Sequence, residues 1–190
     1  MCKIVYLTAK TFDTPAKQFR NALAGELEKR GIEVVTDTTN PIKRFFSSHK
    51  TYGIAIAIDF FRDNGRGCGL TLNKHCSFIS RDFAYSLSNN LDILTPTIRW
   101  RDFKFVDSWD TEWYKFFNKV SSSTKAIFYL CTLTNPEDID EYSLAFDSLV
   151  KAFADEIVRC LRSDYDCKVY ARNVRAARLK VRKYNNQSNG

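Results

Sequence analysis

The nine residues Gly53 to Phe61, G-I-A-I-A-I-D-F-F, are the most apolar stretch of the chain, and they indicate its fold class. Apart from Asp59, every side chain after Gly53 in this stretch is uncharged and apolar. A strand that is apolar on both faces is typical of a parallel or mixed sheet covered by helices. The stretch therefore predicts a central strand of an α/β protein.

Strand and helix patterns alternate on both sides of this stretch. On its N-terminal side we expect a strand at 3–8, a helix at 15–30 closed by Gly31, a strand at 32–36 and a short helix opened by Asn40-Pro41. On its C-terminal side we expect a loop at 63–69, a short strand at 70–72, a helix at 80–89 with Ser80 as its N-cap, a half-exposed strand at 98–106, a helix at 109–120, a buried strand at 125–132 and a long helix at 142–161. This order predicts a mostly parallel central sheet flanked by helices on both faces.

The composition is that of one globular domain with a tail. The chain has 190 residues, of which 44% are apolar, so we expect an α/β domain at 1–165 and a basic tail at 166–190. The N-terminus lacks the features of a signal peptide, and no apolar run is long enough for a transmembrane helix, so a cytoplasmic protein is expected. The six cysteines form no C-x-x-C pair, which argues against a zinc knuckle or a thioredoxin-type motif.

The excess positive charge lies in the tail. The formal net charge is +7, and the seven basic residues between Lys168 and Gly190, where no acidic residue occurs, account for all of it. Nucleic acid or another polyanion is therefore a candidate partner of the tail, whereas the near-neutral body gives no such signal. The candidate polyanion-binding residues are Arg172, Arg175, Arg178, Lys180, Arg182 and Lys183.

A second stretch, Phe128 to Tyr142, reads F-Y-L-C-T-L-T-N-P-E-D-I-D-E-Y and predicts a buried strand that runs through a turn into a helix. It resembles the Val-Glu-x-Gly-Phe-Leu-Ser-Asn-Pro-x-Asp segment of the zinc-dependent N-acetylmuramoyl-L-alanine amidases, the Amidase_3 class of cell-wall hydrolases. Three further segments are similar to that family in the same order: K-I-V-Y-L-T-A-K with L-E-K-R-G-I-E-V-V-T-D, then G-I-A-I-A-I-D-F-F, then S-F-I-S-R-D-F-A-Y-S-L. The resemblance covers roughly residues 3–161 and implies an amidase-like fold.

The residues that carry the family's chemistry are different here. Such an amidase binds Zn²⁺ through two His and one Glu, and uses a second Glu as general base. The resemblance places Lys10, Asp13 and Asp59 at the ligand positions and Tyr129 at the base position. Protonated lysine cannot bind a metal, and tyrosine, with a pKa near 10, is unsuited as a base at neutral pH. The resemblance therefore implies a degenerate site without metal or cofactor, in a cleft lined by Lys10, Asp13, Asp59, Tyr129 and Asn135.

Two ways of rebuilding a catalytic site stay open. Asp13 and Asp59, together with Asp63, could form a carboxylate site, which would favour Mg²⁺ or Mn²⁺ over zinc. Cys131, in the turn of the second stretch, could serve as a nucleophile, although the sequence places no histidine beside it.

The two histidines of the chain offer no obvious replacement. His49 and His75 both fall outside the expected central strands, where open α/β sheets place their ligand sites. His75 adjoins Cys76, but neighbouring residues on an extended chain point to opposite faces, so a dyad between them is unfavourable.

The leading hypothesis is a non-catalytic, amidase-like protein that binds a protein partner or a small ligand through the degenerate cleft. One alternative is a hydrolase, either amidase-like or with a site rebuilt from Asp13, Asp59 or Cys131. The other is a nucleic-acid-associated protein that acts through the basic tail.

Overall fold

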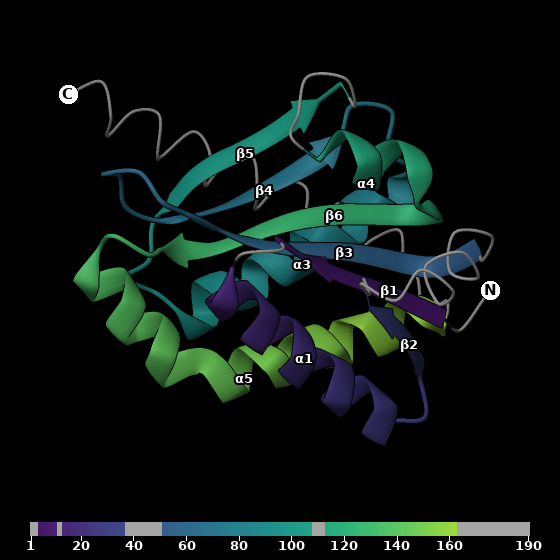
Figure 1. Cartoon of the computed structure of the whole chain (residues 1–190), viewed down its shortest axis with the longest axis horizontal. Helices are drawn as coiled ribbons and strands as arrows, with labels where there is room; N and C mark the ends of the chain where they lie inside the picture. Colours follow the sequence, from purple (N-terminus) through teal and green to yellow (C-terminus); the bar gives the residue numbers. More distant parts are fainter. Residues whose placement is uncertain (1–3, 11–12, 37–50, 108–112, 163–190) are drawn as a thin grey trace.

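The computed structural model describes residues 4–10, 13–36, 51–107 and 113–162 (Figure 1). Its described strands form a six-stranded sheet in the order β2-β1-β3-β6-β4-β5. The strands are β1 (Ile4–Ala9), β2 (Glu33–Thr36), β3 (Thr51–Phe61), β4 (Cys68–Asn73), β5 (Trp100–Val106) and β6 (Ser121–Thr132). The helix expected after Asn40 and the basic tail lie outside the described residues.

The sheet is mostly parallel, as the sequence predicts. Strands β2, β1, β3 and β6 pair in parallel, and β5 is parallel to β4. Among the described strands, the one antiparallel pairing joins β4 to β6. Consequently β1, β3 and β6 end at the edge of the sheet where β4 and β5 begin (Figure 1). Open α/β sheets place their functional sites at such carboxyl ends.

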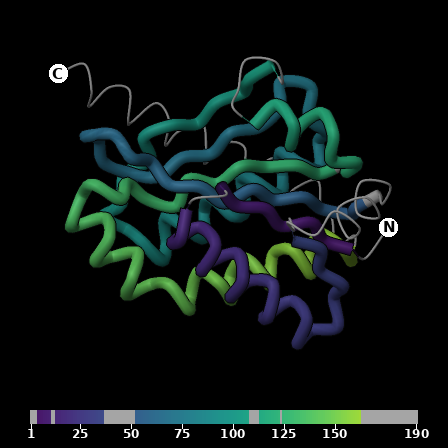
Figure 2. The backbone as a smooth tube through the Cα atoms, in the orientation of Figure 1, coloured from purple at the N-terminus to yellow at the C-terminus, as the bar shows by residue number. Residues whose placement is uncertain are grey.

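Helices cover both faces, but unequally (Figure 2). The helices α1 (Thr14–Lys29), α3 (Phe78–Leu94) and α5 (Pro136–Leu161) pack on one face. The short helix α4 (Tyr114–Lys119) packs on the other. Among the described helices, none is long and apolar enough to cross a membrane.

The central strand β3 shows why its sequence is so apolar. It is hydrogen-bonded between β1 and β6, which confirms the predicted position. Its large side chains Ile54, Ile56, Ile58 and Phe60 enter the main core under the three long helices. Its alanines point the other way, and their small size lets α4 bring its aromatic side chains close to the sheet. The smaller core there contains Ala55, Ala57, Trp113, Phe116, Phe117 and Ile127.

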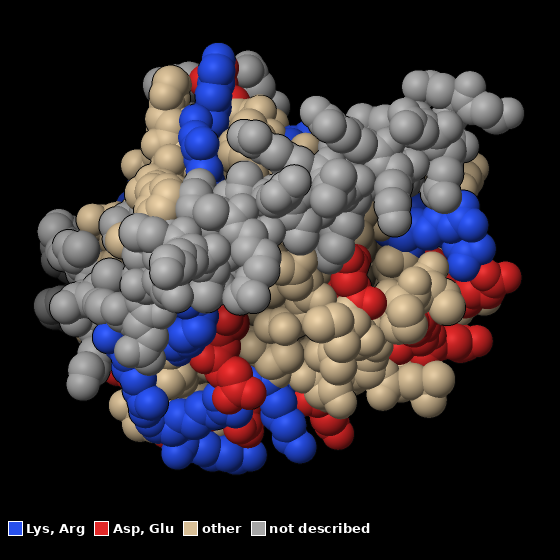
Figure 3. Space-filling view, turned by 180° about the vertical axis from the view of Figure 1, so that it is seen from behind, with Lys and Arg blue, Asp and Glu red and all other residues tan. Residues whose placement is uncertain are grey.

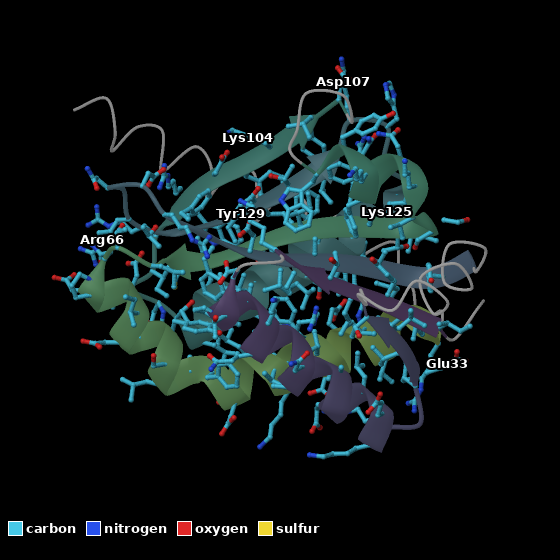
Figure 4. The ribbon with its side chains drawn as sticks, in the orientation of Figure 1. Glu33, Arg66, Lys104, Asp107, Lys125 and Tyr129 are labelled. Atoms are coloured by element: carbon cyan, nitrogen blue, oxygen red, sulfur yellow. The ribbon has the colours of Figure 1, made fainter. Side chains whose placement is uncertain are left out.

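Helix α4 is also tied to the sheet by a half-buried lysine. Lys125 Nζ donates to the carbonyl oxygen of Phe117 at 2.7 Å, and Figure 4 shows Lys125 on β6 near this helix. Burial lowers the pKa of the Lys125 ammonium group. The contact fixes α4 over the first half of β6, away from the carboxyl end of that strand.

Two helix starts differ from the sequence prediction because capping residues lie upstream of the apolar pattern. Helix α3 is capped by Ser77, whose side chain accepts the Ser80 N–H, so the assignment of Ser80 as N-cap was wrong. Helix α5 begins at Pro136 rather than Tyr142, because Asn135 caps it and accepts the Asp138 N–H at 3.0 Å. Proline at the first helical position has its φ angle already set for the helix.

Replacing Asn135 with alanine should destabilise the protein by about 1 kcal/mol, because one N–H at the start of α5 loses its acceptor. The measurement is the free energy of unfolding from urea denaturation. Asp147→Ala, at an exposed position within the same helix, is the matched control. An Asn135→Ala variant as stable as this control would show that the cap contributes nothing.

Candidate functional site

The carboxyl ends of β1 and β3 bring together three residues that the sequence places far apart. Lys10 directly follows β1, and Asp59 lies near the end of β3. Asp13 is the N-cap of α1, where its Oδ1 accepts the Ala16 N–H at 3.1 Å. These are the three positions at which the amidase resemblance places the zinc ligands.

Ion pairs connect these residues with a fourth, Arg62. Lys10 Nζ lies 3.1 Å from Asp59 Oδ2. Arg62 Nη2 lies 2.5 Å from Asp13 Oδ2, and its Nη1 lies 3.7 Å from Asp59 Oδ1. We call Lys10, Asp13, Asp59 and Arg62 the ion-pair cluster. It is a chain of four alternating charges, in which Arg62 bridges the two carboxylates.

The two signs of charge differ in exposure. The side chains of Asp13 and Asp59 are 1% and 0% exposed, whereas those of Lys10 and Arg62 are 39% and 44% exposed. Burying an ionised carboxylate without a counter-charge is strongly unfavourable, so each of these carboxylates requires its cation. The sequence analysis missed Arg62. The available signal was its position, because a basic residue directly follows the buried strand that carries Asp59.

The cluster does not fit a catalytic zinc ion. The cluster offers two carboxylates and no histidine as metal ligands. Both carboxylates are already paired with cations, Asp59 with Lys10 and Arg62, and Asp13 with Arg62. Catalytic zinc sites use three deprotonated protein ligands with an open position for water. Nowhere in the described ranges do three or more His, Cys, Asp or Glu side chains gather to hold a metal ion.

The third carboxylate considered for a rebuilt metal site, Asp63, has another partner. It is exposed and pairs with Arg101, which lowers the pKa of its carboxyl group to about 2. Asp13 and Asp59, in contrast, share Arg62.

Tyr129, at the position of the family's catalytic base, is part of an aromatic stack. It pairs in register with Asp59, and its ring lies parallel to that of Phe61 with 4.5 Å between centroids. The guanidinium of Arg101 lies over the Phe61 ring, 4.5 Å from its centroid. Gly69 permits this arrangement, since a Cβ there would come within 2.8 Å of the ring. Figure 4 shows Tyr129 over β6, apart from Lys125.

The side chain of Cys131 is not activated as a nucleophile. It is fully buried, and burial, followed by the charges of Asp138 and Asp13, raises the pKa of its thiol to about 12. His75, an alternative partner for a nucleophile, is 81% exposed and faces Asp107 at 3.7 Å. His49 lies outside the described residues.

The N-P-E-D turn has a structural role at this edge of the sheet. Besides the Asn135 cap, Asp138 is 1% exposed, and its Oδ2 accepts the Gly67 N–H at 2.6 Å and the Thr132 N–H at 3.3 Å. Thr132 Oγ1 donates to the Gly67 carbonyl at 3.0 Å. The turn thereby joins the end of β6 to the glycine-rich loop that precedes β4.

The glycine-rich loop is shaped by this packing. Gly67 has a φ of +117°, and a Cβ there would lie 2.2 Å from the Arg99 carbonyl oxygen, so only glycine fits. Arg66 in the same loop pairs with Glu137 at 2.6 Å, and Figure 4 shows it beside the start of α5.

A surface hollow of about 420 Å³ lies elsewhere, between the later turns of α1 and the middle of α5. Its lining includes Gly25, Glu26, Asp147 and Lys151, and none of the ion-pair cluster. The ion-pair cluster therefore lies apart from this hollow. On the side of the molecule seen in Figure 3, basic and acidic side chains adjoin one another along the lower edge.

The candidate polyanion-binding residues of the tail lie outside the described residues.

Solved structures of N-acetylmuramoyl-L-alanine amidases match this architecture. N-acetylmuramoyl-L-alanine amidase AmiC2 of Nostoc punctiforme matches with 13% identity and a TM-score of 0.62, over 84% of this chain and 98% of that chain. The N-acetylmuramoyl-L-alanine amidase from Clostridium difficile 630 matches with 12% identity and a TM-score of 0.62, over 86% and 99%. The chain has the amidase fold.

A further structure with this fold was solved with a partner. It is the CwlD amidase from Clostridioides difficile in complex with the GerS lipoprotein, at 14% identity and a TM-score of 0.60, over 84% of this chain and 98% of that chain. No protein-family model matches the chain, and comparison of the sequence with curated proteins finds no match. The likeness to the amidases is therefore one of fold, which the resemblance at Phe128 to Tyr142 had predicted.

The raised pKa of the Cys131 thiol predicts low reactivity. At pH 8 a thiol with a pKa of about 12 should react with iodoacetamide about a thousandfold more slowly than an ordinary cysteine, because the thiolate is the reactive form. Mass spectrometry of the alkylated native protein measures this for each cysteine. Half-buried Cys76 is the internal control, and unfolding in urea should make the two react alike. Fast labelling of Cys131 in the native protein would contradict the prediction, and Cys131 would again be a candidate nucleophile.

Proposed function

We propose that the protein is a non-catalytic member of the amidase fold that binds a protein partner or a small ligand at the surface around the ion-pair cluster. The observation that carries this proposal is the pairing of Asp59 with Lys10 and of Asp13 with Arg62 at the carboxyl ends of β1 and β3. In this arrangement the protein's own cations neutralise the two carboxylates. A divalent metal ion would have to displace both cations from the carboxylates, and its positive charge would then repel theirs.

The proposed absence of catalysis is also supported by the neighbouring side chains. Tyr129 is stacked on Phe61, and phenols are in general poor bases for activating water at neutral pH. The Cys131 thiol is buried and protonated. Among the described side chains, neither Tyr129 nor Cys131 thus offers the cluster an activated nucleophile or a base suited to neutral pH.

A binding role is supported by the exposed part of the same region. Lys10 and Arg62 reach the surface after β1 and β3, and Arg101 lies over the Phe61 ring, which stacks on Tyr129. Arginine and aromatic side chains are enriched at protein interfaces. The CwlD structure, in which an amidase is in complex with a lipoprotein, supports the idea that this fold can present a surface to a protein partner.

The proposal predicts that protein purified without chelator and equilibrated with Zn²⁺ will retain no stoichiometric zinc after dialysis. It also predicts no release of stem peptide from peptidoglycan. Elemental analysis and chromatography of the digest measure these two outcomes. An active amidase of the same fold, treated in parallel, is the positive control. One zinc per chain that is lost in Asp59→Ala, or stem peptide released by the wild type, would refute the proposal and favour a hydrolase.

A second candidate function, binding of nucleic acid or another polyanion, is favoured by the seven basic and no acidic residues from Lys168 to Gly190. If the tail carries this function, deletion of 168–190 should abolish retention of the protein on heparin at low salt. Replacing three exposed lysines of the domain, Lys29, Lys104 and Lys151, by glutamine is a control for charge alone. Retention that survives the tail deletion would exclude the tail as the polyanion-binding segment.

A further inference from the structure

Lys10 and Arg62 reach the surface from two sides of one buried carboxylate. Lys10 Nζ is 3.1 Å from Asp59 Oδ2, and Arg62 Nη1 is 3.7 Å from Asp59 Oδ1. Both cations thus contact the same carboxylate group, each at a different oxygen atom. Their side chains are 39% and 44% exposed. Two partly exposed cations therefore flank one buried carboxylate.

The buried carboxylates hold these cations in fixed positions. Asp59 Oδ1 accepts the Phe60 N–H at 2.9 Å, and Asp13 Oδ1 accepts the Ala16 N–H at 3.1 Å. Each carboxylate is therefore anchored to the backbone at one oxygen and to a cation at the other. Cations held in this way lose little further freedom when they bind a ligand, which lowers the entropic cost of binding.

The charges of the cluster are separated by depth. The four side chains sum to zero, but the negative pair is buried and the positive pair is exposed. An approaching ligand meets the ammonium and guanidinium groups before it meets either carboxylate. Helix α1, with 16 residues, also begins here and adds the partial positive charge of its N-terminus, although Asp13 already caps it. The exposed side of the cluster consequently favours a negatively charged group.

We propose that Lys10 and Arg62 together bind an oxyanion group, a carboxylate or a phosphate, of the ligand or partner. Guanidinium and ammonium groups form charge-assisted hydrogen bonds to such oxygens, and arginine matches the planar geometry of a carboxylate or the edge of a phosphate. This inference rests on the proposed function, because a metal bound at Asp13 and Asp59 would displace the two cations that bind the oxyanion.

The test is a titration of the full chain with sodium phosphate and, separately, with sodium acetate, followed by ¹H–¹⁵N NMR. Sodium chloride keeps the ionic strength constant, so that general screening does not change. The expected result is a saturable shift of the amides of Phe60 and Ala16 with at least one anion. The anion that binds more tightly identifies phosphate or carboxylate as the recognised group.

Variants assign the binding to the two cations. In Arg62→Gln and in Lys10→Gln the anion concentration at half-saturation should rise at least about tenfold, because a charge-assisted hydrogen bond is lost. Lys29→Gln, which removes the same charge at the far end of α1, should leave it unchanged; Lys29 is 77% exposed and pairs with Glu26 at 3.6 Å. If Arg62→Gln does not fold, Arg62→Lys, which keeps the charge, takes its place. Its expected increase in the anion concentration at half-saturation is smaller.

Two outcomes would overturn the inference. One is that the amide shifts do not saturate with either anion. The other is that the anion concentration at half-saturation is the same in the Arg62 and Lys10 variants as in Lys29→Gln. The zinc content of the same sample is measured alongside. A zinc-free protein that fails to bind either anion would refute the oxyanion site and leave the proposed function standing, whereas stoichiometric zinc would refute the proposed function itself.

Discussion

Asp13 and Asp59 are ionisable side chains in the interior of the protein, and the arrangement of the edge of the sheet around them follows from that burial. A carboxylate with no exposed surface must be neutralised or paired. Lys10 and Arg62 supply the pairing from the ends of β1 and β3. Because Arg62 contacts both carboxylates, it also links the start of α1 to the end of the central strand.

Another buried carboxylate, Asp138, organises the neighbouring part of the edge. By accepting N–H groups from Gly67 and Thr132, it holds the glycine-rich loop against the end of β6. The N-P-E-D turn is therefore explained by folding alone: Asn135 caps α5, Pro136 starts it and Asp138 supports the loop.

The combination of a buried negative pair with an exposed positive pair connects the structural and the functional interpretation. In a zinc amidase the corresponding region must leave its ligands free to bind metal and its water free to react. Here the charges are satisfied within the chain, and the aromatic stack of Phe61, Tyr129 and Arg101 covers the adjoining strands. The same contacts that are unfavourable for metal binding create a preorganised, partly exposed cationic surface.

Much of the architecture could be predicted from local pattern. The apolar run from Gly53 to Phe61 determines a strand buried on both faces, and the alternation of strands and helices determines a mostly parallel sheet. The proximity of Lys10, Asp13 and Asp59 followed from the resemblance to the amidases. The boundaries of α3 and α5 were missed because capping at Ser77 and Asn135 extends each helix beyond its apolar stripe.

The sequence by itself determined the class of fold, the order of its elements and the residue types available at the edge of the sheet. Only the tertiary structure decided which charges pair, because Arg62 contacts Asp13 across 49 positions of chain, and no local pattern encodes that distance. It also decided that Gly69 of β4 lies against the Phe61 ring, because β3 and β4 meet at this point only in the folded sheet. Burial supplies the physical reason: the cost of an unpaired charge or a displaced ring depends on what surrounds it, and those surroundings exist only after the chain has folded.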